Sequence, residues 1–308
     1  MQRFLGVDLG GTNIKFVLIE VTGQKLHELR KDQISTEAKE GPDHVTNRIA
    51  NLISEINNET PLDGVAVAVP GIFDHENGEI LLFPNLPGNW EKYPFSEKLR
   101  LATKLNISLI NDARAFCLAE STIGAGRGHR FIACIVLGTG VGGGLVIDGK
   151  IHEGATRGAG EIAHQVVAPD GPLCGCGTRG CVESLTSSAA ISAMAKTSSP
   201  EEAYERAKVG DVDALNAFRT AGKWLGIALA NVNAVFSPEV FVVGGGVAQA
   251  GDLLLDFIRE ELHERNHLWP NSVFKLVPAQ LSFSAGATGA ALKAAEVAGT
   301  QLSFTSIT

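Results

Sequence analysis

Residues Phe4–Glu20 read FLGVDLGGTNIKFVLIE, and residues Phe131–Lys150 read FIACIVLGTGVGGGLVIDGK. Each stretch is an apolar run, a turn containing glycine and threonine, and a second apolar run. Short apolar runs bounded by glycine predict buried strands, and the Asp-Gly pair near the end of the second stretch predicts a hairpin turn. The chain therefore contains two strand–loop–strand units, which predicts an α/β protein with two strand-rich halves.

The two glycine turns lead into strands, whereas the glycine loops of Rossmann and P-loop proteins lead into helices. Neither turn fits those two motifs. A glycine turn in a hairpin can still bind phosphate, because backbone N–H groups approach the oxygens closely where no Cβ intervenes. An ordinary tight hairpin is the alternative for either turn alone, and the presence of two such turns weighs against it.

Other segments alternate between strand and helix patterns. Apolar spacing predicts a helix in residues 43–56, with Asp43 as its N-cap, and another in residues 214–235. A helix also follows the glycines at 244–246, and residues 284–299 form an alanine-rich helix. Buried strands that end in polar or glycine turns are predicted for Val65–Gly71, Asn106–Asp112 and Glu239–Gly246.

The composition limits the class of protein. With 308 residues, the chain is long enough for two domains or one large one. Hydrophobic residues make up 44%, which excludes a disordered chain, and the net charge of −8 disfavours nucleic acid as a partner. No apolar run approaches the roughly 18 residues of a membrane span, and the N-terminus has no signal-peptide pattern. We expect a cytoplasmic protein without a membrane partner.

The stretch from His164 to Cys181 reads HQVVAPDGPLCGCGTRGC and holds three of the five cysteines. The odd cysteine count in a long chain disfavours a disulfide framework. A redox site would favour two cysteines separated by two residues near a βαβ unit, which is absent. One histidine and three cysteines make four N/S ligands with no open position, which predicts structural zinc. Cys117 and Cys134 lie in apolar surroundings and are expected to be core residues.

Carboxylates mark the candidate chemistry. Asp112 follows an apolar strand and precedes a helix, where α/β folds commonly bind ligands, although an N-cap is the alternative. Glu161 and His164 are three residues apart and would share a face if that segment were helical. Glu183 follows Cys181 by two residues, so both glutamates flank the cysteine cluster and a shared site is expected.

Five motifs together resemble the ROK family of repressors and sugar kinases: DLGGTN, PNLPGNW, ND, LGTGVGGGLVIDGKIHEGATRGAGEIAH and CGCGTRGCVE. They occur in the family's order and span essentially the whole chain. The resemblance implies two RNase H-like α/β domains of the actin/hexokinase type with an interdomain cleft. It implies an N-terminal domain of residues 1–116 plus 286–308 and a C-terminal domain of residues 117–285.

The resemblance also implies an ATP-dependent hexose kinase of carbohydrate metabolism and glycolysis. Such an enzyme transfers the γ-phosphate to the 6-hydroxyl of glucose, uses Mg²⁺ and carries structural Zn²⁺. The alternative substrates are N-acetylmannosamine, N-acetylglucosamine, fructose and allose, and a homodimer or homotetramer is expected. A sugar-sensing regulator is disfavoured, because the phosphate loop begins at Asp8 and leaves no room for a DNA-binding domain. A non-catalytic sugar-binding protein is disfavoured by the intact DLGGT, LGTG and Asp112.

Individual roles carry over only to positions that match the family motifs. Asp112 matches the general base, and His164, Cys174, Cys176 and Cys181 match the zinc ligands. The implied sugar contacts are Gly71, Asn85, Asn111, Asp112, Gly140, Glu161, His164 and Glu183. The implied nucleotide and magnesium contacts are Asp8, Gly10, Gly11, Thr12, Asn13, Gly138, Thr139, Gly140, Gly244, Gly245 and Gly246. The chain departs from the common pattern at Asn13, Asn89, Arg114 and Ala163, which bears on the choice of sugar.

Overall fold

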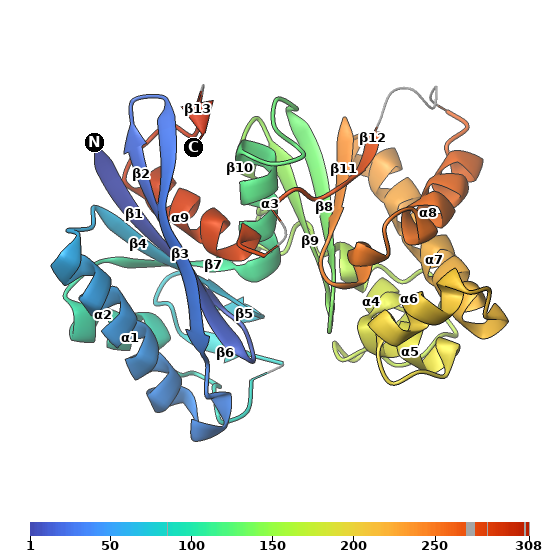
Figure 1. Ribbon diagram of the computed structural model, residues 1–308, viewed down its shortest axis with the longest axis horizontal. Coiled ribbons are helices and arrows are strands. Elements are labelled where there is room, and N and C mark those ends of the chain that lie inside the picture. Colours follow the sequence, from blue (N-terminus) through green and yellow to red (C-terminus); the bar gives the residue numbers. More distant parts are fainter. Residues whose placement is uncertain (85, 269–274, 282, 305, 308) are drawn as a thin grey trace. The chain divides into compact units, whose positions relative to one another are not determined.

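The computed structural model describes residues 1–84, 86–268, 275–281, 283–304 and 306–307 (Figure 1). The chain divides into two compact units, residues 1–124 with 283–308 and residues 125–282. The boundary expected between residues 116 and 117 would cut helix α3 (Asp112–Thr122), which is continuous. The first unit therefore includes the whole of this helix.

The first unit is built on a mixed sheet whose strand order is β13-β3-β2-β1-β4-β7. Its strands are β1 (Gln2–Leu9), β2 (Asn13–Thr22), β3 (Lys25–Ser35), β4 (Gly64–Val69), β7 (Ile107–Asn111) and β13 (Ser306–Ile307). The β1–β2 and β2–β3 pairs are antiparallel, and the β1–β4 and β4–β7 pairs are parallel. The carboxyl ends of β1, β4 and β7 consequently lie at one edge of the sheet.

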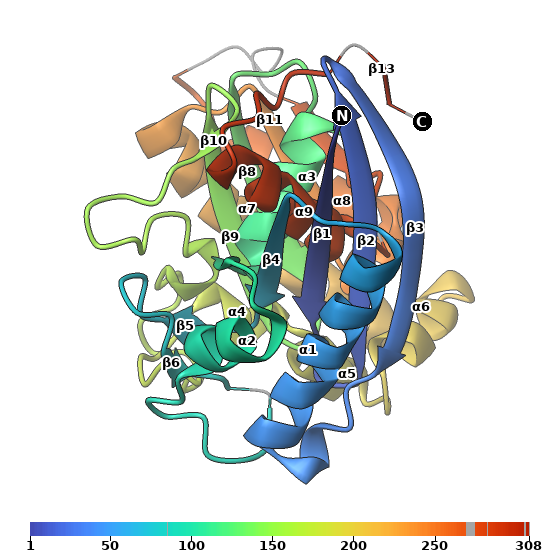
Figure 2. The ribbon, with the colours of Figure 1, turned by 90° about the vertical axis from the view of Figure 1, so that its left-hand side faces the viewer.

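Helices cover both faces of this sheet (Figure 2). On one face, Leu5 and Val7 pack with α1 (Pro42–Glu59) and α2 (Phe95–Thr103) in the core. On the other, Gly6 lets α9 (Ala285–Val297) approach, because a Cβ at Gly6 would lie 1.9 Å from the Ala287 carbonyl oxygen. The short strands β5 (Ile72–Phe73) and β6 (Ile80–Leu82) form a separate hairpin.

The expected cap of the first helix is wrong. Helix α1 begins at Pro42 with Gly41 as its N-cap, and Asp43 lies in its first turn. The Asp43 carboxylate instead accepts hydrogen bonds from the Tyr93 hydroxyl at 2.7 Å and the Lys98 ammonium at 2.8 Å. Proline is favoured at the first helical position, because it has no backbone N–H that would need a capping partner. The helix therefore begins at Pro42, one residue before Asp43.

The second unit repeats the strand pattern of the first. Its sheet has the order β10-β9-β8-β11-β12, with β8–β9 and β9–β10 antiparallel and β8–β11 and β11–β12 parallel. The strands are β8 (Phe131–Leu137), β9 (Val141–Ile147), β10 (Lys150–Ile151), β11 (Val240–Gly244) and β12 (Lys275–Pro278). Asp148 and Gly149 form the two-residue turn between β9 and β10, as the sequence predicts.

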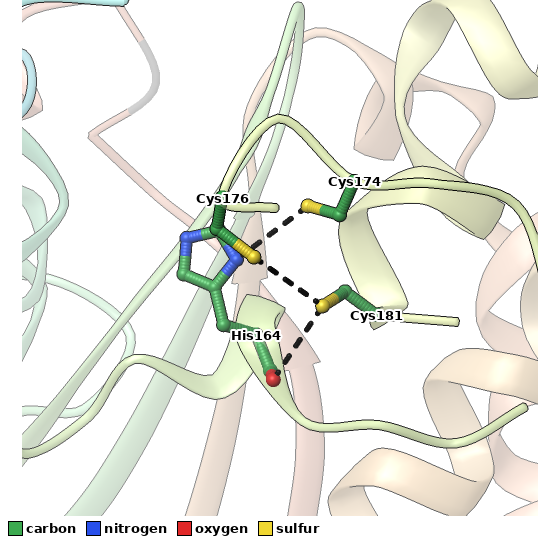
Figure 3. Close-up of side chains that lie close together, drawn as sticks. All are labelled: His164, Cys174, Cys176 and Cys181. Carbon is green, nitrogen blue, oxygen red and sulfur yellow. Dashed lines mark hydrogen bonds between the residues drawn. The ribbon is translucent and has the colours of Figure 1, made fainter. Parts of the chain in front are cut away.

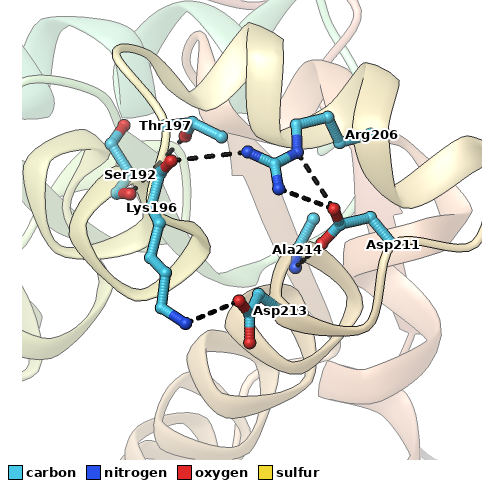
Figure 4. Close-up of polar contacts among 7 residues, drawn as sticks. All are labelled: Ser192, Lys196, Thr197, Arg206, Asp211, Asp213 and Ala214. Carbon is cyan, nitrogen blue, oxygen red and sulfur yellow. Dashed lines mark hydrogen bonds and ion pairs between the residues drawn. The ribbon is translucent and has the colours of Figure 1, made fainter.

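The helices of the second unit are α4 (Val182–Thr186), α5 (Ser188–Ala195), α6 (Pro200–Lys208), α7 (Val212–Phe236) and α8 (Asp252–Arg265). Polar contacts join α5, α6 and α7 (Figure 4). Arg206 forms an ion pair with Asp211 at 2.6 Å, and the Asp211 carboxylate also accepts the Ala214 N–H at the start of α7. Lys196 forms a second pair with Asp213 at 2.7 Å.

None of the helices in the described part of the chain is long and apolar enough to span a membrane.

Candidate active site and metal centre

Asp8 and the first glycine turn occupy the carboxyl end of β1. The turn closes through a hydrogen bond from the Gly10 N–H to the Asn13 carbonyl at 3.1 Å, and Asn13 begins β2. Thr36 donates its hydroxyl to the Gly10 carbonyl at 2.7 Å and its N–H to the Thr12 carbonyl at 2.8 Å. Gly11 and Thr12 are exposed, so the tip of this turn is open to a ligand.

The environment of Asp8 favours its protonated form. Burial raises the pKa of its carboxyl group to about 6, while the Lys15 ammonium acts in the opposite direction. In register, Asp8 lies opposite Ala68 on β4, and Ala68 lies opposite Ile110 on β7. With strands about 4.8 Å apart, Asp8 is about 10 Å across the sheet from the end of β7.

Asp112 is the first residue of α3, directly after β7, and it is not the helix cap. The cap is Asn111, whose side-chain oxygen accepts the N–H groups of Ala113 at 3.1 Å and Arg114 at 3.2 Å. The Asp112 carboxylate also accepts the Ala113 N–H at 2.8 Å, which fixes its orientation. The N-cap role, which was the alternative role for Asp112, therefore belongs to Asn111.

Asn111 also fixes the loop that follows β4. Its amide donates to the Gly71 carbonyl at 3.3 Å. Gly71 has a φ of 116°, and a Cβ there would lie 2.1 Å from the Leu82 carbonyl oxygen. Only glycine fits such a position. Asn85, the remaining sugar contact expected in this unit, lies outside the described residues.

The second glycine turn, residues 138–140, joins β8 to β9. Its Gly138 N–H bonds the Gly140 carbonyl at 2.9 Å. Ser188, the first residue of α5, donates both its N–H at 2.9 Å and its hydroxyl at 2.7 Å to the Gly138 carbonyl. The turn is thereby attached to a helix start.

Glu183 connects this turn to the cysteine cluster. One carboxylate oxygen accepts the Val141 N–H at 3.0 Å, and the other lies 3.4 Å from the Cys174 sulfur. A Cβ at Gly140 would lie 2.7 Å from the first of these oxygens, so the carboxylate lies directly against the turn. The sequence does not reveal this contact, because nothing in the spacing of Gly140 and Glu183 indicates it.

The metal-ligand candidates converge as the sequence predicts (Figure 3). The ligand atoms of His164, Cys174, Cys176 and Cys181 all lie within 4.8 Å of one another. The Cys174 sulfur is 3.8 Å from the Nδ1 of His164, and the sulfurs of Cys176 and Cys181 are 3.6 Å apart. Zn–S and Zn–N bonds of about 2.3 and 2.1 Å place ligand atoms of a tetrahedron about 3.6–3.8 Å apart. Two of the distances between ligand atoms match these values, so the donor set and its spacing suit a tetrahedral metal site.

The loop geometry explains this convergence. Val166 pairs with Cys181 and Leu173 with Arg179 in isolated bridges. The Cys174 N–H bonds the Thr178 carbonyl at 2.8 Å. Gly177 and Gly180 have φ values of 90° and 71°, which permit the tight turns between the ligands.

The thiols have different electrostatic environments. Burial raises the pKa of the Cys174 thiol to about 12 and also raises that of Cys181. At Cys176, which is exposed, a backbone hydrogen bond from Thr178 leads the effects that lower the pKa to about 7. Bound metal favours thiolates at all three positions.

Glu161 and His164 do not share an α-helix. Residues Ile162–His164 form a short 3-10 turn with Glu161 as its N-cap position. His164 directs Nδ1 towards the sulfurs and Nε2 away from them (Figure 3). Glu161 is exposed.

The third glycine segment, Gly244–Gly246, ends β11. Gly245 has a φ of 89°, and a Cβ there would lie 2.2 Å from the Leu137 carbonyl oxygen at the end of β8. A 3-10 turn and helix α8 follow, so this segment does lead into a helix as predicted.

Comparisons with known proteins agree with this architecture. The sequence profile of the ROK family matches residues 4–297. A glucokinase of Thermotoga maritima is 35% identical, over 94% of this chain and 96% of that protein. The structure of a ROK hexokinase from Thermus thermophilus, 32% identical, aligns with a TM-score of 0.83 over 97% of this chain and 99% of that one. The structure of a ROK glucokinase from Streptomyces griseus in complex with glucose and AMPPNP is 30% identical. It aligns with a TM-score of 0.81 over 96% of this chain and 99% of that one.

Proposed function

The chain belongs to the ROK family, which has the actin/hexokinase-like fold, and from this premise we propose that it is an ATP-dependent glucose 6-kinase. The observation that carries the proposal is Asp112 at the end of β7, on the sheet edge that also bears Asp8 and the first glycine turn. The similar proteins named glucokinase, one of them crystallised with glucose and an ATP analogue, support glucose and ATP as substrates.

In the proposed reaction, the carboxylate of Asp112 takes the proton of the sugar 6-hydroxyl. That oxygen forms a bond to the γ-phosphorus as the bond between this phosphorus and the bridging oxygen breaks, and ADP leaves. General-base assistance contributes about 10²–10⁴ in rate. The glycine turns at 10–12 and 138–140 offer backbone N–H groups to the phosphates. Mg²⁺, held through Asp8 and water, would neutralise charge on the phosphates.

The second part of the proposal concerns the metal. The His164, Cys174, Cys176 and Cys181 cluster binds one structural Zn²⁺, which has no open position for water. Bound there, zinc would hold the loop in which Glu183 contacts the second glycine turn, and the outward Nε2 of His164 would be available to a sugar hydroxyl. Glu161 contributes a further acceptor for sugar hydroxyls. Metal analysis should find about one zinc per chain, and fully active protein without metal would contradict the assignment.

The function is tested with a panel of hexoses and amino sugars, each incubated with MgATP. Phosphorus and carbon NMR of the product should find phosphate on the 6-hydroxyl of glucose. Preferred turnover of N-acetylmannosamine, N-acetylglucosamine, fructose or allose would replace glucose within the same mechanism. No turnover with any sugar, combined with sugar binding in calorimetry, would overturn the kinase assignment in favour of a sugar sensor.

A further inference from the structure

The loop after β6, residues 83–84 and 86–90, begins beside the sheet edge that carries the proposed base. A Cβ at Gly71 would lie 3.0 Å from the Cδ of Pro84. The Gly71 carbonyl accepts the amide of Asn111, which directly precedes the base in the chain. The start of this loop is therefore only two contacts away from the base.

An aromatic cluster joins the two ends of this loop. The ring of Trp90 lies 4.9 Å from that of Phe83 and 6.1 Å from that of Phe95, between centroids. The indole N–H of Trp90 donates to the Pro87 carbonyl at 3.1 Å. The ring of Tyr93 meets Trp90 edge-on, with centroids 5.3 Å apart and planes at 73°. Edge-to-face aromatic pairs are favourable contacts, so Tyr93 packs directly on the end of the loop.

The start of helix α1 contacts the same loop at two places. A Cβ at Gly88 would lie 2.8 Å from the Cδ of Pro42, the first residue of α1. The hydroxyl of Tyr93 donates to the Asp43 carboxylate at 2.7 Å, and its oxygen lies 3.0 Å from the Oγ of Thr46. Helix α1 therefore touches the loop directly at Gly88 and is joined to its end through Tyr93.

The bond between Tyr93 and Asp43 has a neutral donor and a charged acceptor. Burial raises the pKa of the Tyr93 hydroxyl to about 12, so it keeps its proton near pH 7. Hydrogen bonds from Lys98 and then from Tyr93 lower the pKa of Asp43, which is ionised at that pH. Hydrogen bonds to an ionised acceptor are stronger than those between neutral groups. The ion pair of Asp43 with Lys98 is exposed and contributes little by itself.

We propose that Tyr93 is a positioning residue for sugar binding, because its hydroxyl attaches the loop after β6 to helix α1 and holds that loop beside the base. The inference rests on the proposed function, since Asn85, an expected sugar contact, belongs to this loop by sequence. A loop that is held before the sugar arrives loses less conformational freedom on binding, which strengthens binding. Packing of Phe83 and Trp90 alone is the alternative, and it would not need the hydroxyl of Tyr93.

The kinetic test compares Tyr93→Phe, which keeps the ring and removes the hydroxyl, with Asp43→Ala, which removes the acceptor. Each should raise the KM for glucose about three- to tenfold, with kcat and the KM for MgATP unchanged. The double variant should show no larger effect than the single ones, because both remove the same hydrogen bond. The control Tyr204→Phe changes the other tyrosine of the chain, on α6, and should be silent. Should Tyr93→Phe fail to fold, as judged by circular dichroism, the exposed Asp43→Ala gives the same comparison.

The second readout is hydrogen exchange without sugar, followed by mass spectrometry. Amides of residues 86–93 should exchange faster in Tyr93→Phe than in wild type, and at the wild-type rate in Tyr204→Phe. Unaltered exchange, an unchanged KM for glucose, or an equal rise in both KM values would overturn the role of Tyr93. If the wild-type protein phosphorylates no sugar, the proposed function fails, yet the exchange rates still decide whether Tyr93 holds this loop.

Discussion

The two units have the same strand pattern, and each has a glycine turn between two antiparallel strands. Different hydrogen bonds hold the two turns. In the first unit, hydrogen bonds from Thr36 to Gly10 and Thr12 hold the turn beside Asp8. In the second, Ser188 and the carboxylate of Glu183 hold it, and Glu183 also reaches the cysteine cluster. The repeated strand pattern therefore carries two glycine turns that differ in the side chains that hold them.

The difference suggests a division of labour. The first unit has carboxylates at the ends of parallel strands, Asp8 on β1 and Asp112 after β7. The second has a loop in which His164 and three cysteines could hold a metal ion, and Cys174 of this cluster lies 3.4 Å from the Glu183 carboxylate. We expect substitution of Asp112 in the first unit to lower the rate of phosphate transfer, and substitutions in the His164 and cysteine cluster of the second unit to weaken sugar binding.

The largest effect is expected for Asp112→Asn. The substitution keeps the size of the side chain and removes the base, so kcat should fall by about 10²–10⁴. Glucose binding in calorimetry should remain within a few-fold of wild type. Near-normal turnover would show that the proton of the hydroxyl goes elsewhere.

Removal of a metal ligand should have the next largest effect. Cys176→Ser should lose zinc and raise the KM for glucose by about 10–100-fold. Disturbing the surroundings of a metal site typically lowers metal affinity or activity by this factor. The control Cys117→Ala changes a buried cysteine outside the cluster and should retain zinc. A zinc-free Cys176→Ser enzyme with the wild-type KM would separate the metal from sugar binding.

Glu183→Ala tests the connection between the metal loop and the glycine turn. It removes the acceptor of the Val141 N–H, a charged hydrogen bond worth about 1.5–3 kcal/mol. Because Glu183 is also an expected sugar contact, we expect the KM for glucose to rise at least tenfold while zinc content stays at the wild-type level. Glu205→Ala, in an exposed ion pair on α6, is the matched control and should be silent.

The smallest effect concerns stability. Burial raises the folded-state pKa of Asp8 to about 6, above its ordinary value of 3.8, so the folded protein binds more protons than the unfolded chain between these pH values. The ionised group therefore costs stability as the pH rises through this range. Asp8→Asn should leave the free energy of unfolding unchanged near pH 4 and raise it by on the order of 3 kcal/mol at pH 7.5, despite loss of activity.

Urea unfolding at the two pH values measures this effect. Asp43→Asn is the opposite control, since a hydrogen bond from Lys98 lowers the pKa of Asp43 and its loss should destabilise at pH 7.5. Equal behaviour of the two variants would contradict the environment assigned to Asp8.

The sequence predicts the strand–turn–strand units, the helix after Gly246 and the convergence of His164 with three cysteines. These features depend on short-range patterns of apolar residues, glycine and metal ligands. The N-cap of α1, the capping role of Asn111 and the contact between Glu183 and Val141 were not predicted. They depend on where a helix starts to within one residue, or on pairing between segments more than 40 residues apart, which local patterns do not encode.

The most direct test of this division of labour is the single-turnover rate of phosphate transfer at saturating glucose and MgATP. Asp112→Asn, zinc-free Cys176→Ser and wild type are compared side by side. The account predicts a loss of about 10²–10⁴ for Asp112→Asn and a rate within a few-fold of wild type for Cys176→Ser. An equally large loss for Cys176→Ser, with the protein folded and saturated, would contradict it.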